Sequence, residues 1–390
     1  MDDLSQLVQQ QKETLIATRR DLHRIPETGF NEVKTSAYVA QRLNELGLEV
    51  QEGVATTGVV GLLRTGKPGP TLMIRSDMDA LPIAEETGLP FASTHSGCMH
   101  ACGHDSHMAM ALGAAAVLNR LRDRIRGNVK FVFQPAEEGP GGAQPMIAAG
   151  VLENPKVDYA IGCHLWSERP EGYLGVRPGP FMAAMDRFDL KIIGKGGHGA
   201  QPHLCVDAIE VGAQVVAALQ RIVSRKMDPI EPAVVTVGSF HAGTAFNIIP
   251  AEAVMSGTTR TFNDEIWKSW EARIDTVVRG VCESMGAAYE LKFSRGYPPT
   301  VNDAQMAEVV RRCAIQVVGE DRVVVPALTM GGEDMSFFLK CVPGCYYCIG
   351  VGREGAAPLH NSKFEFKEDL MLLGVETHCR VALDLLGAKG

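Results

Sequence analysis

VKFVFQPAEEG, the stretch at residues 129–139, indicates the fold class of this chain. Its apolar run predicts a buried β-strand, and two adjacent carboxylates, Glu137 and Glu138, follow directly after it. Similar apolar runs occur at 59–63, 71–74, 159–163 and 346–349, and helical segments separate several of them, notably 105–124 and 302–318. Strands that alternate with helices predict an α/β domain with a mixed, largely parallel sheet flanked by helices. Functional residues of such domains gather at the carboxyl ends of strands, which is where the two glutamates stand.

The first fifty residues predict two helices. Apolar residues at near-helical spacing predict one over residues 5–25, and Pro26 ends it because proline cannot continue a helix. Asn31 is a candidate N-cap for a second helix that runs to about Leu46, with Val33 in its apolar stripe.

The middle of the chain has a different pattern. It predicts, in order, strand 187–193, helix 205–225, strands 233–240 and 252–261, helix 264–285 and strand 288–294. A β-α-β-β-α-β order is the ferredoxin-like arrangement. A chain of 390 residues is too long for one core. We therefore expect two domains, a discontinuous α/β domain of residues 1–184 and 296–390 and an inserted α+β domain of residues 185–295.

The composition is that of a soluble globular chain, with 45% hydrophobic residues, 22% charged residues and a net charge of −8. Without clustered Lys and Arg, nucleic acid is not an expected partner. The first residues carry no secretory signal, and apolar stretches such as 108–118 are too short to span a membrane. We therefore expect a cytoplasmic protein with no membrane partner, whose ten cysteines are free thiols or metal ligands.

MHACGHDSH, at residues 99–107, packs a thiol, three imidazoles and a carboxylate into one short run. Cys102 and His104 are two apart with a glycine between them, so a thiolate and a neutral nitrogen can converge on one metal ion. Taken singly, Cys102 is read as a buried core thiol and His104 as a satisfied core histidine. The density of the cluster favours the metal.

The pair Glu137-Glu138 can divide the work of a hydrolase, because adjacent carboxylates can point in different directions. One can bind a metal while the other accepts a proton from water. The alternative is a solvated acidic turn. The flanking Pro135 and Gly139, at the end of an apolar strand, favour the functional interpretation.

Further polar residues stand near the ends of other strands. His164 and His360 are single histidines, and each alone favours a core or surface role. Asp77 or Asp79, after the strand at 71–74, could orient a histidine ligand from behind. The alternative for both aspartates is a helix cap or a turn.

Three other features favour ordinary structural roles when taken alone. His198 lies in the glycine-rich turn at 194–199, which lacks the spacing of a phosphate-binding loop, and is read as a surface histidine. Arg260 is read as a solvated charge. The cysteines at 341, 345 and 348 lack the second ligand pair of a zinc ribbon, which favours apolar packing.

Together these segments resemble the di-metal amidohydrolase and peptidase superfamily, which contains aminoacylases and carboxypeptidases. The most similar branch includes hippurate hydrolases, N-acetyl-diaminopimelate deacetylases and plant hydrolases of auxin–amino-acid conjugates. The matching motifs are RDLH (20–23), PE (26–27), RSDMDALP (75–82), the run at 99–107, QPAEEG (134–139), GCH (162–164), the run at 194–203, FNIIP (246–250), GGED (331–334) and LH (359–360). Several motifs in one order are more specific than any one of them.

The resemblance implies a catalytic domain with an inserted lid domain and two divalent metal ions, either Zn²⁺, Mn²⁺, Co²⁺ or Ni²⁺. The five implied ligands are Cys102, His104, Glu138, His164 and His360. Cys102 would bridge the two ions. Glu137 matches the general base, and Asp79 matches a carboxylate that orients a ligand.

The resemblance also assigns roles in the insertion. His198 matches a histidine that stabilises the oxyanion, often from the lid of a partner subunit. Asn247 and Arg260 resemble positions that contact the carboxylate or carbonyl of the substrate. A homodimer formed through the lid is expected.

The expected activity is hydrolysis of the amide bond of a small N-acyl amino acid. A dipeptidase or carboxypeptidase on the same scaffold is the first alternative. A non-catalytic metal-binding protein and a thiol-based redox protein that uses Cys102 are alternatives from other classes. The acyl group is left open, because pocket residues are scattered over such a fold.

Overall fold

The computed structural model describes residues 2–387, which divide into two compact units. The first unit consists of the chain up to Gly179, Val301–Ala327 and the chain from Asp334 onward. The second unit consists of Pro180–Thr300 and Leu328–Glu333. The chain passes between the units within β7 (Gly179–Met182) and β14 (Thr300–Asn302), and again on either side of Leu328–Glu333.

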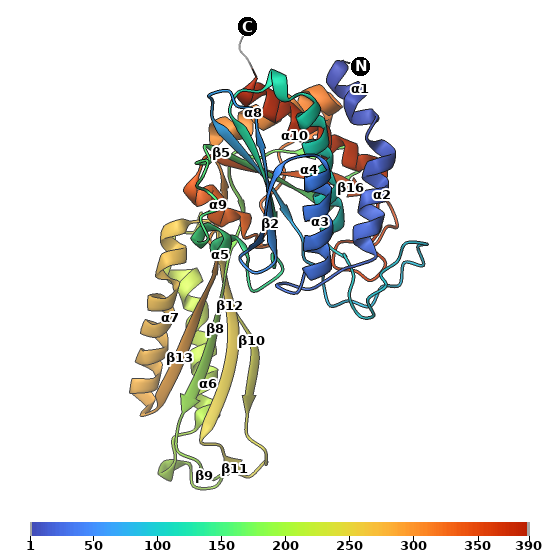
Figure 1. The fold of residues 1–390 in the computed structure, drawn as a ribbon. Helices are drawn as coiled ribbons and strands as arrows, with labels where there is room; N and C mark the ends of the chain where they lie inside the picture. Colours follow the sequence, from blue (N-terminus) through green and yellow to red (C-terminus); the bar gives the residue numbers. More distant parts are fainter. Residues whose placement is uncertain (1, 388–390) are drawn as a thin grey trace. The chain divides into compact units, whose positions relative to one another are not determined.

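The first unit is built on a sheet whose strand order, over the described residues, is β1-β2-β4-β3-β5-β16-β6-β15. Figure 1 labels β2, β5 and β16 of this sheet. The strands are β1 (Glu49–Val54), β2 (Gly58–Arg64), β3 (Thr71–Asp77), β4 (Asn128–Gln134), β5 (Tyr159–Pro170), β6 (Leu174–Gly175), β15 (Val323–Val324) and β16 (Gly344–Gly352). Strands β4, β3, β5 and β16 run parallel, whereas β1, β2 and β6 join through antiparallel pairs. Asp77 pairs with Gln134 where β3 and β4 end, so the segments after these strands leave from one edge.

Helices pack on this sheet and bury its apolar side chains in one core. They are α1 (Asp3–Gln9), α2 (Lys12–His23), α3 (Val33–Glu45), α4 (His104–Arg120), α5 (Ala143–Ala148), α8 (Ala304–Val318), α9 (Met335–Cys341) and α10 (Met371–Leu386), with short 3-10 turns at Arg122–Arg124, Glu320–Arg322 and Glu368–Leu370. Helix α4 is buried along most of its length because it packs against α2, α10 and β3. The start of α4 is therefore held firmly where the cysteine- and histidine-rich run enters the helix.

The single helix predicted over residues 5–25 is wrong, because the chain forms α1 and α2 with a break at Gln10 and Gln11. The apolar stripe changes its partner at this break. Helix α1 packs mainly on α10, whereas α2 packs on α4.

The predicted cap at Asn31 is also wrong. Helix α3 begins at Val33, and the backbone N–H groups of Lys34 and Thr35 donate to the carboxylate of Glu27 at 3.2 and 3.0 Å. Asn31 instead donates from its amide to the carbonyl of Gly29. Val33, which was expected in the apolar stripe, is the first residue of α3 and is 67% exposed.

Lys130 places a charge inside the apolar strand β4. Its amine is buried and donates to the carbonyl oxygens of Val151, Glu153 and Pro155 at 2.8, 2.8 and 3.0 Å. Burial lowers the pKa of Lys130 to about 8. The three carbonyls use all three ammonium protons, so this lysine fixes the turn that follows α5.

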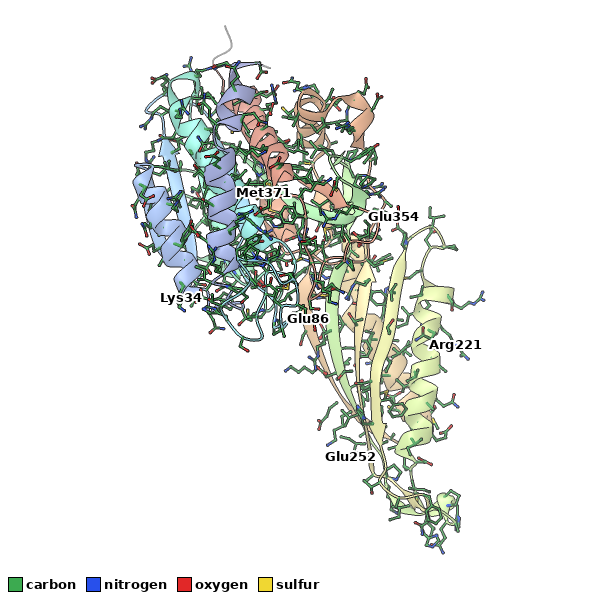
Figure 2. All side chains as sticks on the ribbon, turned by 90° about the vertical axis from the view of Figure 1, so that its right-hand side faces the viewer. Lys34, Glu86, Arg221, Glu252, Glu354 and Met371 are labelled. Carbon is green, nitrogen blue, oxygen red and sulfur yellow. The ribbon has the colours of Figure 1, made fainter. Side chains whose placement is uncertain are left out.

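The second unit is a four-stranded antiparallel sheet, over the described residues, with strand order β10-β12-β8-β13. Its main elements are β8 (Ala184–Ile193), α6 (Ala208–Lys226), β10 (Ala233–Ala242), β12 (Glu252–Thr261), α7 (Asp264–Met285) and β13 (Ala288–Tyr297). Inward residues of β8, such as Phe188 and Leu190, pack with α6 and α7 in a separate core. The exposed Arg221 projects from α6 (Figure 2). A 3-10 turn at Pro202–Leu204 precedes α6, which begins at its Asp207 cap rather than at the predicted residue 205.

These two units bear out the predicted fold class, an α/β unit with a largely parallel sheet and an inserted ferredoxin-like α+β unit. Within residues 2–387, no helix combines the length and apolarity needed to cross a bilayer. The ten cysteines are free thiols; Cys345 and Cys348 are buried in β16, whereas Cys341 is exposed at the end of α9.

Candidate metal centre

The ends of three strands and two loops of the first unit bring polar side chains together. Asp79 follows β3, the pair Glu137-Glu138 follows β4, and His164 lies within β5. His104 is the first residue of α4. His360 comes from the loop after β16. The parallel register explains the convergence, because β3 and β4 end together and the pairing of β3 with β5 stops at Gly162, just before His164.

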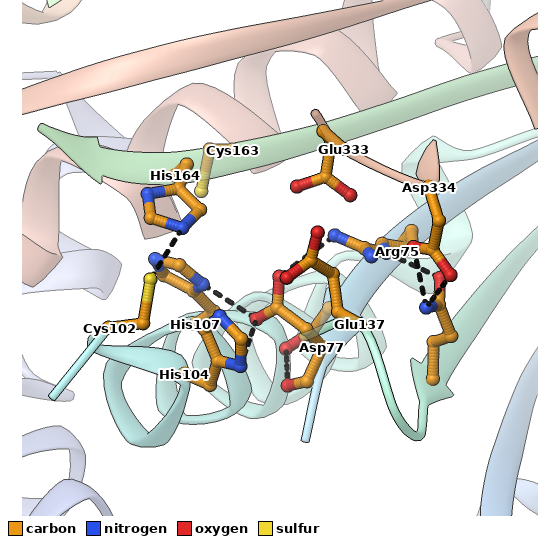
Figure 3. A network of polar contacts seen from close by, with 12 residues as sticks. Arg75, Asp77, Cys102, His104, His107, Glu137, Cys163, His164, Glu333 and Asp334 are labelled. Carbon is orange, nitrogen blue, oxygen red and sulfur yellow. Dashed lines mark hydrogen bonds and ion pairs between the residues drawn. The ribbon is translucent and has the colours of Figure 1, made fainter. Parts of the chain in front are cut away.

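The five predicted ligands form two groups that share one atom. The ligand atoms of Cys102, His104 and His164 lie within 4.8 Å of one another, and so do those of Cys102, Glu138 and His360. The Cys102 Sγ lies 3.4 Å from His164 Nε2 and 3.2 Å from His360 Nε2. This sulfur is thus the one atom common to both groups, and Figure 3 shows it facing the ring of His164.

His104 passes a direct test of whether these residues fit a metal. Its Nδ1 lies 2.9 Å from the backbone carbonyl oxygen of Asp79, which can only accept, so Nδ1 carries the proton. The opposite atom, Nε2, is buried and makes no hydrogen bond to any described residue. An imidazole with a fixed tautomer and a free inward nitrogen, beside a thiol and carboxylates, suits a divalent transition metal.

His164 is oriented in the same way. Its Nδ1 donates to the carbonyl of Leu165 at 2.5 Å, which leaves Nε2 facing the sulfur of Cys102. Burial, together with the nearby His107, lowers the pKa of His164 to about 3, so this imidazole is neutral at pH 7 and can act as a ligand.

Cys102 and His104 hold their protons firmly in this cluster, because their surroundings raise both pKa values. Burial raises the pKa of Cys102 well above its usual value, and the carboxylates of Glu138 and Glu137 raise it further. Burial opposes the charge on His104, but Asp77 and Asp79 outweigh it and raise the pKa to about 10. Divalent ions would displace these protons, since thiolate and neutral imidazole are the binding forms.

Asp79 holds two parts of the cluster: its backbone carbonyl bonds to His104, and its side chain holds the turn at Glu137 and Glu138. Its two carboxylate oxygens accept the backbone N–H groups of Glu137 and Glu138 at 2.9 and 3.0 Å. Burial opposes ionisation of Glu138, but its hydrogen bond to His360 and the charge of His104 lower its pKa to about 2. Glu137 is buried, and one of its carboxylate oxygens lies within 4.8 Å of the ligand atoms of His104 and Glu138. The turn thus places both carboxylates near His104, and Glu138 also bonds to His360.

His360 is the most accessible of these residues, with 53% of its side chain exposed. It has a φ of 63°, and its N–H donates to the carbonyl of Ala101 at 2.8 Å. This contact ties the loop after β16 to the segment that carries Cys102. It brings His360 Nε2 to 3.1 Å from Glu138 Oε1.

Sequence reasoning named Asp77 behind this cluster, as one of two candidates to orient a histidine, but it gave no role to Arg75 or His107. Asp77 accepts from Arg75 at 2.8 Å and from His107 at 2.7 Å, and Arg75 also donates to Asp334 at 2.8 Å. Asp334 in turn accepts from the side chain of Gln134. The available signal for His107 was its spacing of three residues from His104, which places both on one face of a helix.

The predicted residues of the second unit fall into two separate places. His198 (in β9, Gly197–His198) pairs with Ile248 (in β11, Ile248–Ile249), and the carbonyl of Asn247 accepts from Gly199 at 2.9 Å. His198 and Asn247 are therefore neighbours on one exposed ribbon. The N–H of Ala200 donates to His198 Nδ1 at 3.0 Å, which leaves Nε2 as the donor of the neutral ring.

Arg260 lies near the far end of β12 from this ribbon. It lies eight positions after Glu252 at the start of the strand, roughly 26 Å at strand spacing. Its guanidinium donates to the carbonyls of Met330 and Thr259 at 3.1 and 2.8 Å. In this structure Arg260 thus secures the segment Leu328–Glu333 of its own unit.

Comparison with known proteins identifies the family. The model of peptidase family M20/M25/M40 matches residues 73–384. An N-acyl-L-amino acid amidohydrolase of Geobacillus stearothermophilus is 48% identical over 302 residues, which cover 77% of this chain and 81% of the relative. A thermostable carboxypeptidase of Saccharolobus solfataricus is 40% identical over 390 residues and 98% of each chain.

Solved structures agree with the sequence comparisons. The Bacillus subtilis YXEP protein, described as a dinuclear metal binding peptidase from the M20 family, superposes with a TM-score of 0.83 at 34% identity, covering 96% of this chain and 98% of that one. The chain belongs to peptidase family M20/M25/M40. It is an enzyme that acts on amide bonds, as the sequence predicted.

Proposed function

We propose that this enzyme hydrolyses the amide bond that joins an acyl group to an amino acid, with two divalent metal ions. The observation that carries the proposal is the pair of ligand groups that share Cys102 Sγ, with the buried carboxylate of Glu137 beside them. A binding protein needs the ligands but has no need of a further carboxylate placed as a base. A relative at 48% identity that is named for N-acyl-L-amino acids supports the substrate class.

The five residues that would hold the ions are Cys102, His104, Glu138, His164 and His360. A donor set of one thiolate, three imidazoles and one carboxylate suits Zn²⁺, Mn²⁺, Co²⁺ or Ni²⁺. When bound, such ions supply Lewis acidity, which polarises an amide carbonyl and makes a water molecule more acidic.

Glu137 is the proposed general base. Its backbone is held by Asp79, so its carboxylate keeps a fixed position at the edge of the cluster. In this role the carboxylate takes a proton from the attacking water and delivers it to the nitrogen of the leaving amine. Proton transfer of this kind contributes roughly 10²–10⁴-fold to catalysis.

The second unit is the proposed lid and dimerisation domain. His198 is a suitable oxyanion donor because its Nδ1 accepts from Ala200, which leaves the N–H on Nε2. Asn247 and Arg260 are proposed to contact the carboxylate or carbonyl of the substrate. For Arg260, this role would require the guanidinium to turn from the carbonyl of Met330. The homodimer and the cytoplasmic location expected from the sequence also stay predictions.

A carboxypeptidase or dipeptidase activity is the second candidate, because the Saccharolobus relative that matches nearly the whole chain is named a carboxypeptidase. The two candidates differ in the group on the carbonyl side of the scissile bond. An N-acyl amino acid presents a blocked acyl group, whereas a dipeptide presents a free amine.

The experiment is a substrate screen with defined metals. The protein is stripped with a chelator and restored with Zn²⁺, Mn²⁺, Co²⁺ or Ni²⁺, and turnover is measured for N-acetyl and N-benzoyl amino acids and for unblocked dipeptides. We expect no turnover without metal and the highest kcat/KM for an N-acyl amino acid. Faster cleavage of dipeptides would favour the second candidate, and full activity of the metal-free protein would refute both.

A further inference from the structure

His107 uses both ring nitrogens in a buried chain of hydrogen bonds behind the metal cluster. Its Nδ1 lies 2.7 Å from Asp77 Oδ1, and its Nε2 lies 3.0 Å from the backbone nitrogen of Leu165. The exposed fractions of His107 and Asp77 are 2% and 0%. Water therefore has little access to either group, and the geometry of the pair is set by the protein alone.

The partners of His107 fix where its proton lies. A carboxylate can only accept, so Nδ1 donates to Asp77, and a backbone N–H can only donate, so Nε2 accepts from Leu165. Asp77 also accepts from Arg75 Nη1 at 2.8 Å. Asp77, His104 and His107 lie close enough to hold an ion, but the bonds of Asp77 and His107 already satisfy that group from within.

The peptide group of Leu165 is the point where this chain reaches a proposed ligand. Its N–H donates to His107, and its carbonyl accepts from Nδ1 of His164, the preceding residue, at 2.5 Å. Strand β3 pairs with β5 as far as Gly162 and then ends its pairing, so no β3 carbonyl meets the N–H of Leu165. A buried N–H needs a partner, and the imidazole of His107 supplies it where the sheet stops.

The support behind His107 is rigid. Arg75 donates to Gln134 Oε1 at 2.9 Å and to Asp334 Oδ1 at 2.8 Å as well as to Asp77 (Figure 3). Each of these side chains has an exposed fraction of 2% or less. A displacement of His107 would therefore leave several buried polar groups without hydrogen-bond partners at once.

We propose that His107 is a positioning residue, which sets the place of the His164 imidazole by holding the Leu165 peptide between Asp77 and the ligand. The inference rests on the proposed metal-dependent function, because it assigns His107 to the metal group of Cys102, His104 and His164. It assigns no effect on the group of Cys102, Glu138 and His360, since the hydrogen bonds of His107 go to Asp77 and Leu165 and not to the segments that carry Glu138 or His360. The two metal equivalents should therefore respond differently to a change at His107.

The test measures metal binding by the whole protein rather than turnover. His107→Phe keeps a ring but removes both hydrogen bonds, whereas His107→Gln keeps an N–H donor and a carbonyl acceptor on one side chain. His378→Phe is the matched control, because His378 is likewise buried, at 1% exposed, and bonds to Tyr347 Oη and Cys163 Sγ. Cys163 directly precedes His164 in β5, and successive side chains of a strand point to opposite faces. The side chain of Cys163 therefore lies on the face opposite to that of His164.

Co²⁺ is titrated into the metal-free proteins, with the visible spectrum of the bound ion as the second readout. We expect His107→Phe to weaken one of two equivalents by roughly 10–100-fold and to change its spectrum, as loss of a partner behind a ligand typically does. The other equivalent should keep its affinity, His107→Gln should recover part of the loss, and His378→Phe should bind both ions normally.

Other outcomes overturn the proposal separately from the function. Wild-type protein that binds two ions, with His107→Phe binding both equally well and with an unchanged spectrum, would remove the positioning role. Three equivalents in the wild type and two in His107→Phe would make His107 a ligand instead. If His107→Phe does not fold, His107→Gln and Asp77→Asn carry the comparison, and unchanged binding in both overturns the proposal. Wild-type protein that binds no Co²⁺ would refute the proposed function itself, and with it this inference.

Discussion

The buried cluster of proposed metal ligands in the first unit and the exposed ribbon of the second unit hold histidines in opposite ways. His104 and His164 are buried, and each has its tautomer fixed by a backbone carbonyl. His198 is exposed, and its ring contact is with the N–H of Ala200, two residues away. Both regions carry residues proposed for one reaction.

This difference follows from what each role demands. Metal ligands must stand ready in a fixed geometry, so distant parts of the chain, from Asp79 to His360, are folded around them. A donor on an exposed ribbon needs the right proton on the right nitrogen, and a two-residue turn is enough for that. The first region should therefore couple function to stability, whereas the second should not.

The largest effect is expected for Cys102→Ala. Cys102 Sγ belongs to both ligand groups, so its removal should abolish binding of both ions and reduce turnover to the level of the metal-free enzyme. Metal content after dialysis and kcat for an N-acyl amino acid measure this. Cys98→Ala, a half-buried thiol four residues earlier, is the control. Retention of both ions by Cys102→Ala would contradict the shared-ligand interpretation.

Glu137→Gln should keep both ions and lose about 10²–10⁴-fold in kcat, because an amide cannot accept the proton from water. Turnover and metal content are measured on the same sample. Glu13→Gln, an exposed glutamate on α2, serves as the control. Near-wild-type activity would remove Glu137 from the mechanism, and loss of metal would make it a ligand.

His198→Ala should lower kcat by about 10²–10³-fold, the usual effect of removing one oxyanion donor. In contrast to changes in the buried cluster, it should leave the metal content and the midpoint of thermal unfolding unchanged, since His198 is exposed. Kinetics, metal analysis and a melting curve test the contrast together. A lower melting temperature for His198→Ala would break the proposed separation of function from stability.

The smallest effect concerns pH. Burial lowers the pKa of His378 and of His100 to about 3, so both stay neutral in the folded chain while the unfolded chain gains a proton below about 6.5. Stability from these groups is therefore present above pH 6.5 and is lost as pH falls towards 3, by up to about 1.4 kcal/mol per pH unit for each group.

Urea unfolding at pH 7 and pH 5 measures this effect. His378→Phe should reduce the loss between the two pH values, whereas His241→Asn, an exposed histidine on β10, should not. An equal loss in wild type and His378→Phe would show that His378 does not contribute to acid sensitivity.

The features that could be predicted from the sequence are those that depend on short spacings between residues. The strand at 129–133 and the six elements of the inserted unit have local periodicity, and the structure places them within a few residues of their predicted bounds. The pair Cys102 and His104 and the pair Glu137 and Glu138 were visible for the same reason. Which glutamate binds and which acts as base came from the family resemblance rather than from the spacing.

The missed features depend on contacts between distant segments. The cap of α3 comes from Glu27 because the preceding loop folds back, and no local rule separates it from Asn31. The break between α1 and α2 follows from a change of packing partner. His107 could be placed on the face of His104, but its proposed role depends on the pairing of β3 with β5 ending at Gly162, before Leu165.

The backbone at His360 limits which replacements evolution can explore there. A φ of 63° disfavours residues with a Cβ atom by roughly 1–2 kcal/mol, and Asn and Asp tolerate it best after glycine. Glycine would relieve the backbone but remove the donor atom, whereas Cys or Glu would keep a donor on an unfavourable backbone. A lineage that gives up histidine at this position while keeping the loop is left with Asp or Asn, and Asp would add a second negative charge beside Glu138. Few residue types are thus suitable at position 360, for two independent reasons: the conformation of the main chain and the chemistry of the side chain.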